Sequence, residues 1–248
     1  MNKNNIVLNT LVFDEEHNEG VKQTEMLSQV AGFGIKNAEV RREYFTDPMA
    51  AAPAIGKTVK KLGLKLFYSV PKTIFTDDGE LNPDLPLYFE EASKMGVSSL
   101  KMNIGHFDKF TGDLHTALAR YSDSDIEFNV ENDQGQLNGS TQNILKFLNA
   151  SKNENIDIKF VFDLGNWRFV GEKENDAAKS LKPFVRYIHV KNDIVDEQSK
   201  CQVVALDQGI INWKATLKLL PNNLPVALEY PATDDEIKAG INLLVNFA

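Results

Sequence analysis

The sequence predicts an α/β fold, a single-domain (β/α)8 TIM barrel that spans residues 1–248. Three observations lead to this prediction. Eight short apolar runs that suit β-strands recur along the chain, and helix-compatible segments lie between them. A length of 248 residues is typical of such a barrel. No linker rich in Gly, Ser or Pro divides the chain into two domains.

The predicted strands are rich in β-branched and aromatic residues. They cover 6–13, 37–45, 64–70, 98–104, 126–131, 158–163, 186–191 and 224–230. A barrel closes only when the first strand pairs with the last, so we expect the two chain ends to meet. The alternative, a doubly wound open sheet, would usually place a glycine-rich phosphate loop after the first strand, and NTLVFDEEHNEG is not one.

Helix signals are clearest in three of the intervening segments. Segment 21–34 carries a glycine near its C-terminal end. Segment 140–152 opens with a Ser or Thr that suits a helix cap. Segment 232–248 opens with Thr233 and acidic residues, followed by apolar residues at helical spacing. These segments fit the helices that alternate with strands in a barrel.

Alternation along the last four strands predicts which side chains point into the barrel, because successive side chains of a strand lie on opposite faces. The bulky face should pack against the helices. The other face carries polar residues near the carboxyl ends of the strands, where barrel active sites lie. These residues are Glu131, Asp163, His189 and Glu229.

Three carboxylates and one imidazole cannot share a dry space unpaired. A divalent cation is the simplest partner, and this ligand set suits Mn²⁺, Mg²⁺, Co²⁺ or Zn²⁺. The alternative is that each group pairs with a lysine or arginine across the barrel. Four more charged residues share the inward parity: Glu39, Arg41, Lys101 and Lys191.

These four residues admit two interpretations. Glu39 and Arg41 suit an internal ion pair, although either could contact substrate. Lys101 and Lys191 lie near strand ends, where they could bind a carboxylate or phosphate on a sugar.

The segments FNVEND, FDLGNW, YIHVKND and ALEYP, in this order, resemble the sugar phosphate isomerase/epimerase family of xylose isomerase-like barrels. The resemblance begins at AEVRREYF and covers nearly the whole chain. It implies one divalent metal ion held by Glu131, Asp163, His189 and Glu229. It also implies that Glu131 and Glu229 are catalytic and exchange protons beside a sugar carbonyl, through an enediolate. We therefore expect a metal-dependent isomerase or epimerase whose partner is a small sugar, sugar phosphate or sugar acid.

One departure from the family concerns the residue three positions after Asp163. Many epimerases of this type have a substrate-contacting histidine there, and this chain has Asn166. An amide can hydrogen-bond a hydroxyl but cannot take a proton, so a non-catalytic sugar-binding barrel is an alternative. Trp167 could form a wall of the pocket or pack beneath the loop. His106 could touch substrate or lie on the surface.

Composition and net charge argue against several other classes of protein. The net charge of −8 opposes nucleic acid as a partner. An abasic-site endonuclease of the same superfamily is therefore a weaker alternative, and its metal cluster needs more histidines than four comfortably supply. No apolar run is long enough to span a membrane, and the apolar run near the start is too short for a signal peptide, so we expect neither. The single cysteine, Cys201, excludes an internal disulfide. We therefore expect a cytoplasmic protein. The sequence is also compatible with a homo-oligomer.

Overall fold

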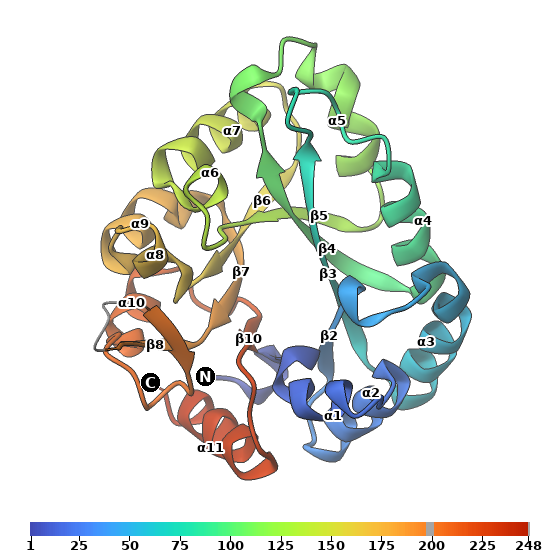
Figure 1. Ribbon diagram of the computed structural model, residues 1–248, viewed down its shortest axis with the longest axis vertical. Helices are drawn as coiled ribbons and strands as arrows, with labels where there is room; N and C mark the ends of the chain where they lie inside the picture. Colours follow the sequence, from blue (N-terminus) through green and yellow to red (C-terminus); the bar gives the residue numbers. More distant parts are fainter. Residues whose placement is uncertain (197–200, 248) are drawn as a thin grey trace.

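The structure is a computed structural model that describes residues 1–196 and 201–247. Its parallel strands form a closed barrel in the order β1-β10-β7-β6-β5-β4-β3-β2, which helices surround (Figure 1). The barrel strands are β1 (Ile6–Asn9), β2 (Asn37–Arg41), β3 (Lys65–Phe75), β4 (Val97–Gly105), β5 (Glu127–Glu131), β6 (Ile158–Asp163), β7 (Val185–Val190) and β10 (Val226–Leu228). The predicted (β/α)8 barrel is confirmed, and the open-sheet alternative is wrong.

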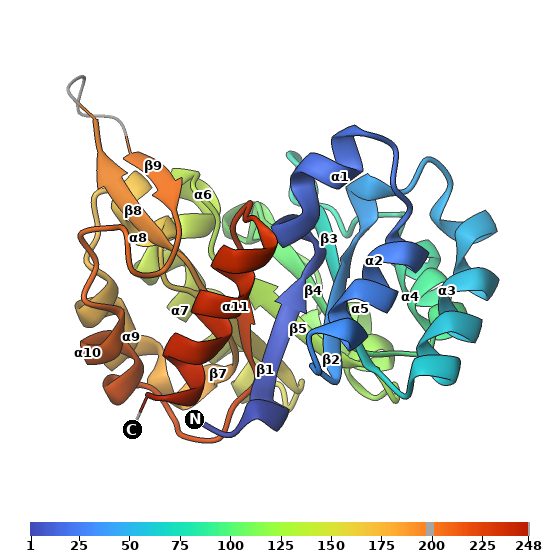
Figure 2. The ribbon, with the colours of Figure 1, turned by 90° about the horizontal axis from the view of Figure 1, so that it is seen from below.

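Closure of the barrel brings the two ends of the chain together. Ile6 of β1 pairs with Val226 of β10, and Leu8 pairs with Leu228. The amino group of Met1 donates to the carbonyl of Phe247 at 2.6 Å. Figure 2 shows the two ends side by side at the same end of the barrel.

Side chains cap some helices of the outer layer, whereas others begin without a side-chain capping hydrogen bond, including the helix that follows Ser140. The helices are α1 (Asp14–Asn18), α2 (Gln23–Gly32), α3 (Pro48–Leu62), α4 (Leu85–Met95), α5 (Leu114–Ser122), α6 (Gln136–Gly139), α7 (Thr141–Asn153), α8 (Asn166–Phe169), α9 (Glu174–Leu181), α10 (Trp213–Leu219) and α11 (Asp234–Val245). Thr233 and Glu236 form a reciprocal capping box at the start of α11. At the end of α3, Gly63 adopts φ +62°, which a residue without Cβ adopts at little cost.

Several strands end at other residues than the sequence predicts. β1 stops at Asn9 because the Asn9 side chain accepts from the backbone N–H of Leu11 at 2.9 Å and starts a 3₁₀ turn. β10 stops at Leu228, which places Glu229 one residue beyond the strand. β3 continues to Phe75 through an irregular register with β4. Each shift occurs at the carboxyl end of a strand, where the backbone departs from regular pairing.

A hairpin that the sequence did not predict follows β7. Its strands, β8 (Asn192–Val195) and β9 (Cys201–Val204), pair antiparallel and project from one end of the barrel (Figure 2). The Asn192 side chain holds the base of the hairpin by donating to the carbonyls of Leu206 and Ile211 at 2.8 and 3.1 Å. The hairpin therefore rises beside the carboxyl ends of the strands.

Apolar packing separates the inside of the barrel from its outside. A small interior cluster consists of Val7, Phe67, Val161, Tyr187 and Ala227. The bulky residues of the other parity, such as Phe160 and Ile188, belong to the large cluster beneath the helices. The parity prediction is confirmed by this division. Among the helices in the described part of the chain, none combines the length and apolarity that a membrane crossing requires.

Candidate active site

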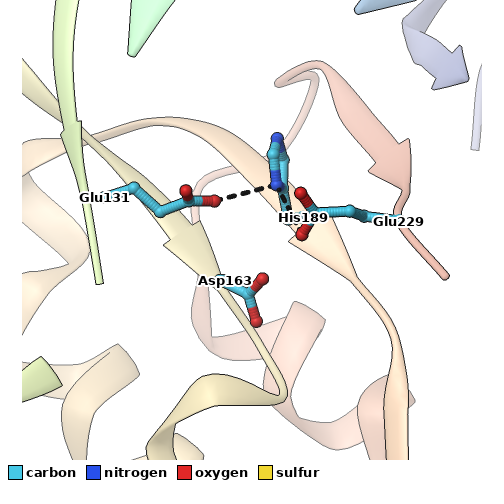
Figure 3. A group of neighbouring side chains, drawn as sticks. All are labelled: Glu131, Asp163, His189 and Glu229. Carbon is cyan, nitrogen blue, oxygen red and sulfur yellow. Dashed lines mark ion pairs between the residues drawn. The ribbon is translucent and has the colours of Figure 1, made fainter. Parts of the chain in front are cut away.

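Four polar side chains converge at the carboxyl ends of neighbouring strands. Glu131 ends β5, Asp163 ends β6, His189 lies in β7 and Glu229 follows β10. All four are buried, and one ligand atom from each lies within 4.8 Å of the others. Figure 3 shows them gathered around one point, as the strand parity predicts. We refer to these four residues as the acid–histidine cluster.

The His189 ring occupies the centre of this cluster. Its Nδ1 lies 2.9 Å from Glu131 Oε1 and 3.0 Å from Glu229 Oε2. The other ring nitrogen points away from these carboxylates (Figure 3) and lies 2.9 Å from Glu39 Oε2. The two sides of the ring therefore face different carboxylates.

Several atoms at the centre of the cluster lack a hydrogen bond. Glu131 Oε1, Asp163 Oδ2 and His189 Nδ1 are buried without a hydrogen-bond partner of suitable geometry among the described residues. The short distance from His189 Nδ1 to Glu131 Oε1 is an ion-pair contact whose direction does not form a hydrogen bond. Buried oxygen and nitrogen atoms that converge without hydrogen bonds in this way suit a bound cation. The acid–histidine cluster thus fits a divalent metal ion.

The loop after β6 fixes the position of Asp163. The backbone N–H of Asp163 donates to Asn132 Oδ1 at 2.9 Å, and Asn132 Nδ2 donates to the Asp163 carbonyl at 3.0 Å. Asp163 Oδ1 accepts from the backbone N–H groups of Gly165 and Asn166 at 2.9 and 3.0 Å. One carboxylate oxygen therefore shapes the loop, and the other, Oδ2, faces the cluster. Asn132 was missed in the sequence, although it follows Glu131 directly in FNVEND.

Three cations surround the acid–histidine cluster. Lys101 Nζ contacts Glu131 Oε2 and lies 3.8 Å from Glu229 Oε1. Lys191 Nζ lies 2.8 Å from Asp163 Oδ2 and 3.6 Å from Glu229 Oε2. Arg41 donates to Glu229 Oε1 at 3.0 Å. The alternative of ion pairs across the barrel is thus realised alongside the cluster geometry.

Burial and these neighbours shift the ionisation of the cluster. Burial, together with Glu229 and Glu131, raises the pKa of Asp163 to about 7 against the opposing effect of Lys191. Burial opposes charge on Glu229, but His189, Lys101 and Lys191 outweigh it and hold the pKa of Glu229 well below its usual value. Burial likewise opposes charge on His189, whereas Glu229 and Glu39 raise the pKa of His189 well above its usual value. The protein without a bound cation therefore keeps His189 protonated.

The charges around the acid–histidine cluster also favour a divalent metal ion. Arg41 also pairs with Glu43, so the ion-paired set around the cluster includes that carboxylate. Five carboxylates in this set face three lysine or arginine cations: Glu39, Glu43, Glu131, Asp163 and Glu229 against Arg41, Lys101 and Lys191. If His189 is neutral, as a metal ligand must be, the set lacks two positive charges. A divalent cation would make it neutral.

A cavity of about 640 Å³ opens above the cluster. Glu131 and Glu229 line it, as do Lys101, Lys191 and Arg41. Asp163 and His189 are not among the described residues that line it, and both are fully buried. Two members of the cluster can therefore reach a bound molecule, and two lie behind them.

Asn166 contributes an unused acceptor to the cavity wall. Its Nδ2 donates to the backbone carbonyl of Asn132 at 2.8 Å, which fixes the orientation of the amide. Its Oδ1 is buried without a hydrogen-bond partner among the described residues. Because Asn166 lines the cavity, this oxygen suits a hydroxyl donor of a ligand.

Three residues predicted to contact substrate lie elsewhere. Trp167 follows Asn166 on α8 but points to the helix side, where its ring centre lies 5.2 Å from that of Phe162. His106 lies outside the cavity lining, with its Nδ1 3.2 Å from Asp108 Oδ1. Glu39 is fully buried beneath His189. None of the three is among the described residues that line the cavity, because position near a strand end does not determine where a side chain ends; a contact with substrate stays a prediction for them.

Other residues of the site were missed in the sequence. Asn9 donates to Glu39 Oε1 and Glu229 Oε1 at 3.0 and 3.3 Å. Tyr187 donates to Glu39 Oε2 from deep in the barrel. Val203, from the unpredicted hairpin, forms part of the cavity wall. The sequence signal for Tyr187 was its inward parity, which it shares with His189.

Family membership follows from the sequence match. Residues 32–247 match the model of a family described as xylose isomerase-like TIM barrel. The chain belongs to this family. The match includes every member of the acid–histidine cluster and confirms the resemblance inferred from the strand-end motifs.

Several solved structures have the same fold as this xylose isomerase-like barrel. The probable 3-DHS dehydratase AsbF of Bacillus anthracis has a TM-score of 0.73 at 14% identity, covering 98% of this chain and 99% of that chain. The IOLI protein with a binding zinc atom has a TM-score of 0.68 at 12% identity, covering 98% and 97%. D-psicose 3-epimerase has a TM-score of 0.65 at 11% identity, covering 97% and 96%. These identities support the fold alone, and no curated protein sequence matches the chain.

Proposed function

We propose that this xylose isomerase-like barrel is a metal-dependent isomerase or epimerase that acts on a small carbohydrate derivative. One observation carries the proposal: of the four buried cluster residues, Glu131 and Glu229 line the cavity, whereas Asp163 and His189 lie behind them. This arrangement divides the cluster into two carboxylates that can reach substrate and two groups that anchor a cation.

The proposed chemistry is a proton transfer beside a carbonyl. One of the two glutamates removes a proton from a carbon next to the carbonyl, and the electron pair of that C–H bond moves onto oxygen as an enediolate. In an isomerisation, the other glutamate takes the proton of the substrate hydroxyl and delivers it to the neighbouring carbon, and the first glutamate gives its proton to the former carbonyl oxygen. In an epimerisation, the other glutamate takes a proton from solvent and delivers it to the opposite face of the same carbon, and the first glutamate releases its proton to solvent. A divalent cation held by the cluster would stabilise the negative charge on the enediolate oxygens.

Ionisation of the two glutamates supports this role. Burial raises the pKa of Glu131, but Lys101 and His189 reverse the effect and leave that pKa below its usual value. The pKa of Glu229 is also lowered. Both residues are therefore carboxylates at neutral pH, as a base requires. The proton that either glutamate takes from substrate is then held next to a lysine.

The cavity favours a ligand with hydroxyl groups and a negative charge. Asn166 Oδ1 is a free acceptor for a hydroxyl. Lys101, Lys191 and Arg41 line the same cavity, and once a metal ion neutralises the cluster carboxylates their charges become available to an anion. A sugar phosphate or a sugar acid suits this surface better than a neutral sugar.

Two alternatives make different predictions. A sugar-binding barrel without turnover is compatible with Asn166, which cannot exchange a proton. An abasic-site endonuclease requires several metal ions, but the described residues contain a single group of candidate ligands, and the net charge of −8 repels DNA. The geometry therefore favours proton transfer on a small molecule.

The test is an exchange assay in D₂O. The protein is loaded with Mn²⁺, Mg²⁺, Co²⁺ or Zn²⁺ and incubated with ketoses, aldoses, their phosphates and their acids, and ¹H NMR follows deuterium incorporation and product formation. Glu131→Gln and Glu229→Gln should each lose the exchange by about 10²–10⁴-fold.

The matched control for these variants is Glu91→Gln. Glu91 is also buried and paired, through Arg42 and Tyr68, but it lies outside the cavity. Binding of sugars without exchange under any metal would favour the non-catalytic barrel. Exchange that survives loss of both glutamates would contradict the proposed mechanism.

A further inference from the structure

Glu39 is a buried carboxylate that the proposed chemistry does not use. It lies in β2, its side chain has no exposed surface, and it does not line the cavity. A carboxylate inside a barrel needs partners that offset its desolvation. The identity of those partners indicates what Glu39 does.

The partners of Glu39 hold it rigidly against one side of His189. Oε2 lies 2.9 Å from His189 Nε2 and also accepts from the Tyr187 hydroxyl. Oε1 accepts from Asn9 Nδ2 at 3.0 Å and lies 3.8 Å from Lys101 Nζ. Both oxygens therefore have polar partners, and Glu39 has no exposed surface through which a substrate could reach it.

The contact with Glu39 determines which nitrogen of His189 carries a proton in the metal-bound protein. A carboxylate next to Nε2 stabilises the tautomer with hydrogen on Nε2, since that nitrogen must then donate. Nδ1 is left with its lone pair, and it faces Glu131 Oε1 and Glu229 Oε2 (Figure 3). The two nitrogens thus have separate tasks.

We propose that Glu39 is a positioning residue that makes His189 Nδ1 the ligand atom of the metal site, with Tyr187 and Asn9 holding the carboxylate in place. The inference rests on the metal site of the proposed function but not on the identity of the substrate. Carboxylates that accept from a ligating histidine fix its tautomer and orientation, and losing one typically costs about 10–100-fold in metal affinity.

The test measures metal binding without any turnover assay. Zn²⁺ affinity is determined by competition with a chromophoric chelator for the wild type and for Glu39→Gln, a variant of nearly the same volume. We expect Glu39→Gln to bind Zn²⁺ about 10–100-fold more weakly. In the Zn²⁺-loaded wild type, ¹H–¹⁵N correlation of histidine side chains should show hydrogen on Nε2 of His189, assigned by its loss in His189→Gln.

A graded variant and a control variant separate positioning from general damage. Tyr187→Phe removes one donor that holds the Glu39 carboxylate but leaves the contact with His189, so it should weaken Zn²⁺ binding less than Glu39→Gln does. Glu91→Gln removes a buried charge between Arg42 and Tyr68, outside the cluster, and should keep the Zn²⁺ affinity. A visible spectrum of the Co²⁺-loaded proteins should change in Glu39→Gln and stay the same in Glu91→Gln.

The outcomes distinguish this inference from the proposed function. A wild type that binds Zn²⁺ tightly and a folded Glu39→Gln with unchanged affinity and unchanged Co²⁺ spectrum would overturn the role of Glu39 alone. A His189 proton on Nδ1 in the Zn²⁺-loaded wild type would do the same. A wild type that binds no divalent metal would overturn both the positioning role and the proposed metal-dependent reaction.

Discussion

Lys191 and Asp163 form a buried ion pair, with Nζ 2.8 Å from Oδ2. Asp163 belongs to the group of candidate metal ligands, and its Oδ2 lacks a hydrogen bond of suitable geometry among the described residues. A metal ion bound at this oxygen would share it with Lys191. The ion pair with Lys191 and the proposed binding of a metal ion therefore both depend on the negative charge of Asp163.

Asp163→Asn should weaken metal binding and reduce turnover. The amide can still accept from the N–H groups of Gly165 and Asn166 through Oδ1, so the loop should keep its shape. A neutral amide is a poorer ligand for a hard cation, and it leaves Lys191 without its closest partner. Metal content of the purified variant, beside deuterium incorporation into substrate, measures the effect. Full metal occupancy with full exchange would reduce Asp163 to a structural ion-pair partner.

The lysines should contribute to anion recognition. Lys191→Met or Lys101→Met is expected to raise KM more for phosphorylated or carboxylated sugars than for neutral ones, because each ammonium lines the cavity. Steady-state kinetics on matched pairs of charged and neutral substrates, with the metal held at saturation, measures the difference. Equal effects on both classes would assign the lysines to charge balance of the acid–histidine cluster.

Gly165→Ala should displace the Lys191 side chain, because the added methyl group would clash with it. A Cβ at Gly165 would lie 2.7 Å from Lys191 Cγ and 3.0 Å from Lys191 Cε, closer than van der Waals contact allows. The backbone of Gly165 has φ −83°, which alanine adopts freely, so the effect would come from crowding alone. We expect a loss of roughly 1–3 kcal/mol in unfolding free energy.

Chemical denaturation measures the loss in Gly165→Ala, and kinetics should show a change in anion affinity similar to that of Lys191→Met. Gly171→Ala is not a suitable control, because Gly171 has φ +79° and would be strained for a different reason. Gly32→Ala is suitable, since nothing lies within 4 Å of its added Cβ. Unchanged stability and unchanged kinetics in Gly165→Ala would mean that Lys191 can move without consequence.

Asp193→Asn should stabilise the protein at alkaline pH. Asp193 has no exposed surface, and neither carboxylate oxygen has a hydrogen-bond partner among the described residues. Burial raises the pKa of Asp193 to about 6, although Lys191 and Arg168 oppose the shift. A raised pKa means that the folded state binds the proton more tightly than the unfolded state, so stability falls as the pH rises from about 4 to about 6.

The asparagine variant does not ionise and should avoid this loss. Its advantage in unfolding free energy should be small near pH 4 and reach roughly 1–3 kcal/mol above pH 7. Thermal unfolding across this pH range measures it, with the exposed Asp207→Asn as the control. A constant difference between Asp193→Asn and wild type at every pH would show that the carboxylate is not the cause.

The sequence alone was sufficient to predict the barrel and the acid–histidine cluster. Side chains alternate strictly along a strand, so an inward-facing residue near a carboxyl end must point toward the mouth of the barrel. Glu131, Asp163 and His189 follow this rule. Glu229 follows it from one residue beyond β10, where its backbone N–H still donates to the carbonyl of Val190 in β7. Local periodicity and a fixed topology therefore determined which residues meet.

Only the tertiary structure decided what each charged side chain contacts. Glu39 and Arg41 share a parity, yet one lies buried beneath His189 and the other reaches the cavity wall. Trp167 packs under the helices because α8 turns it away from its neighbour Asn166, which lines the cavity. Parity determines the face of a strand but not the depth of a side chain in the barrel or the partner opposite it. Those depend on the register between strands and on the irregular backbone at their ends, which distant segments set together.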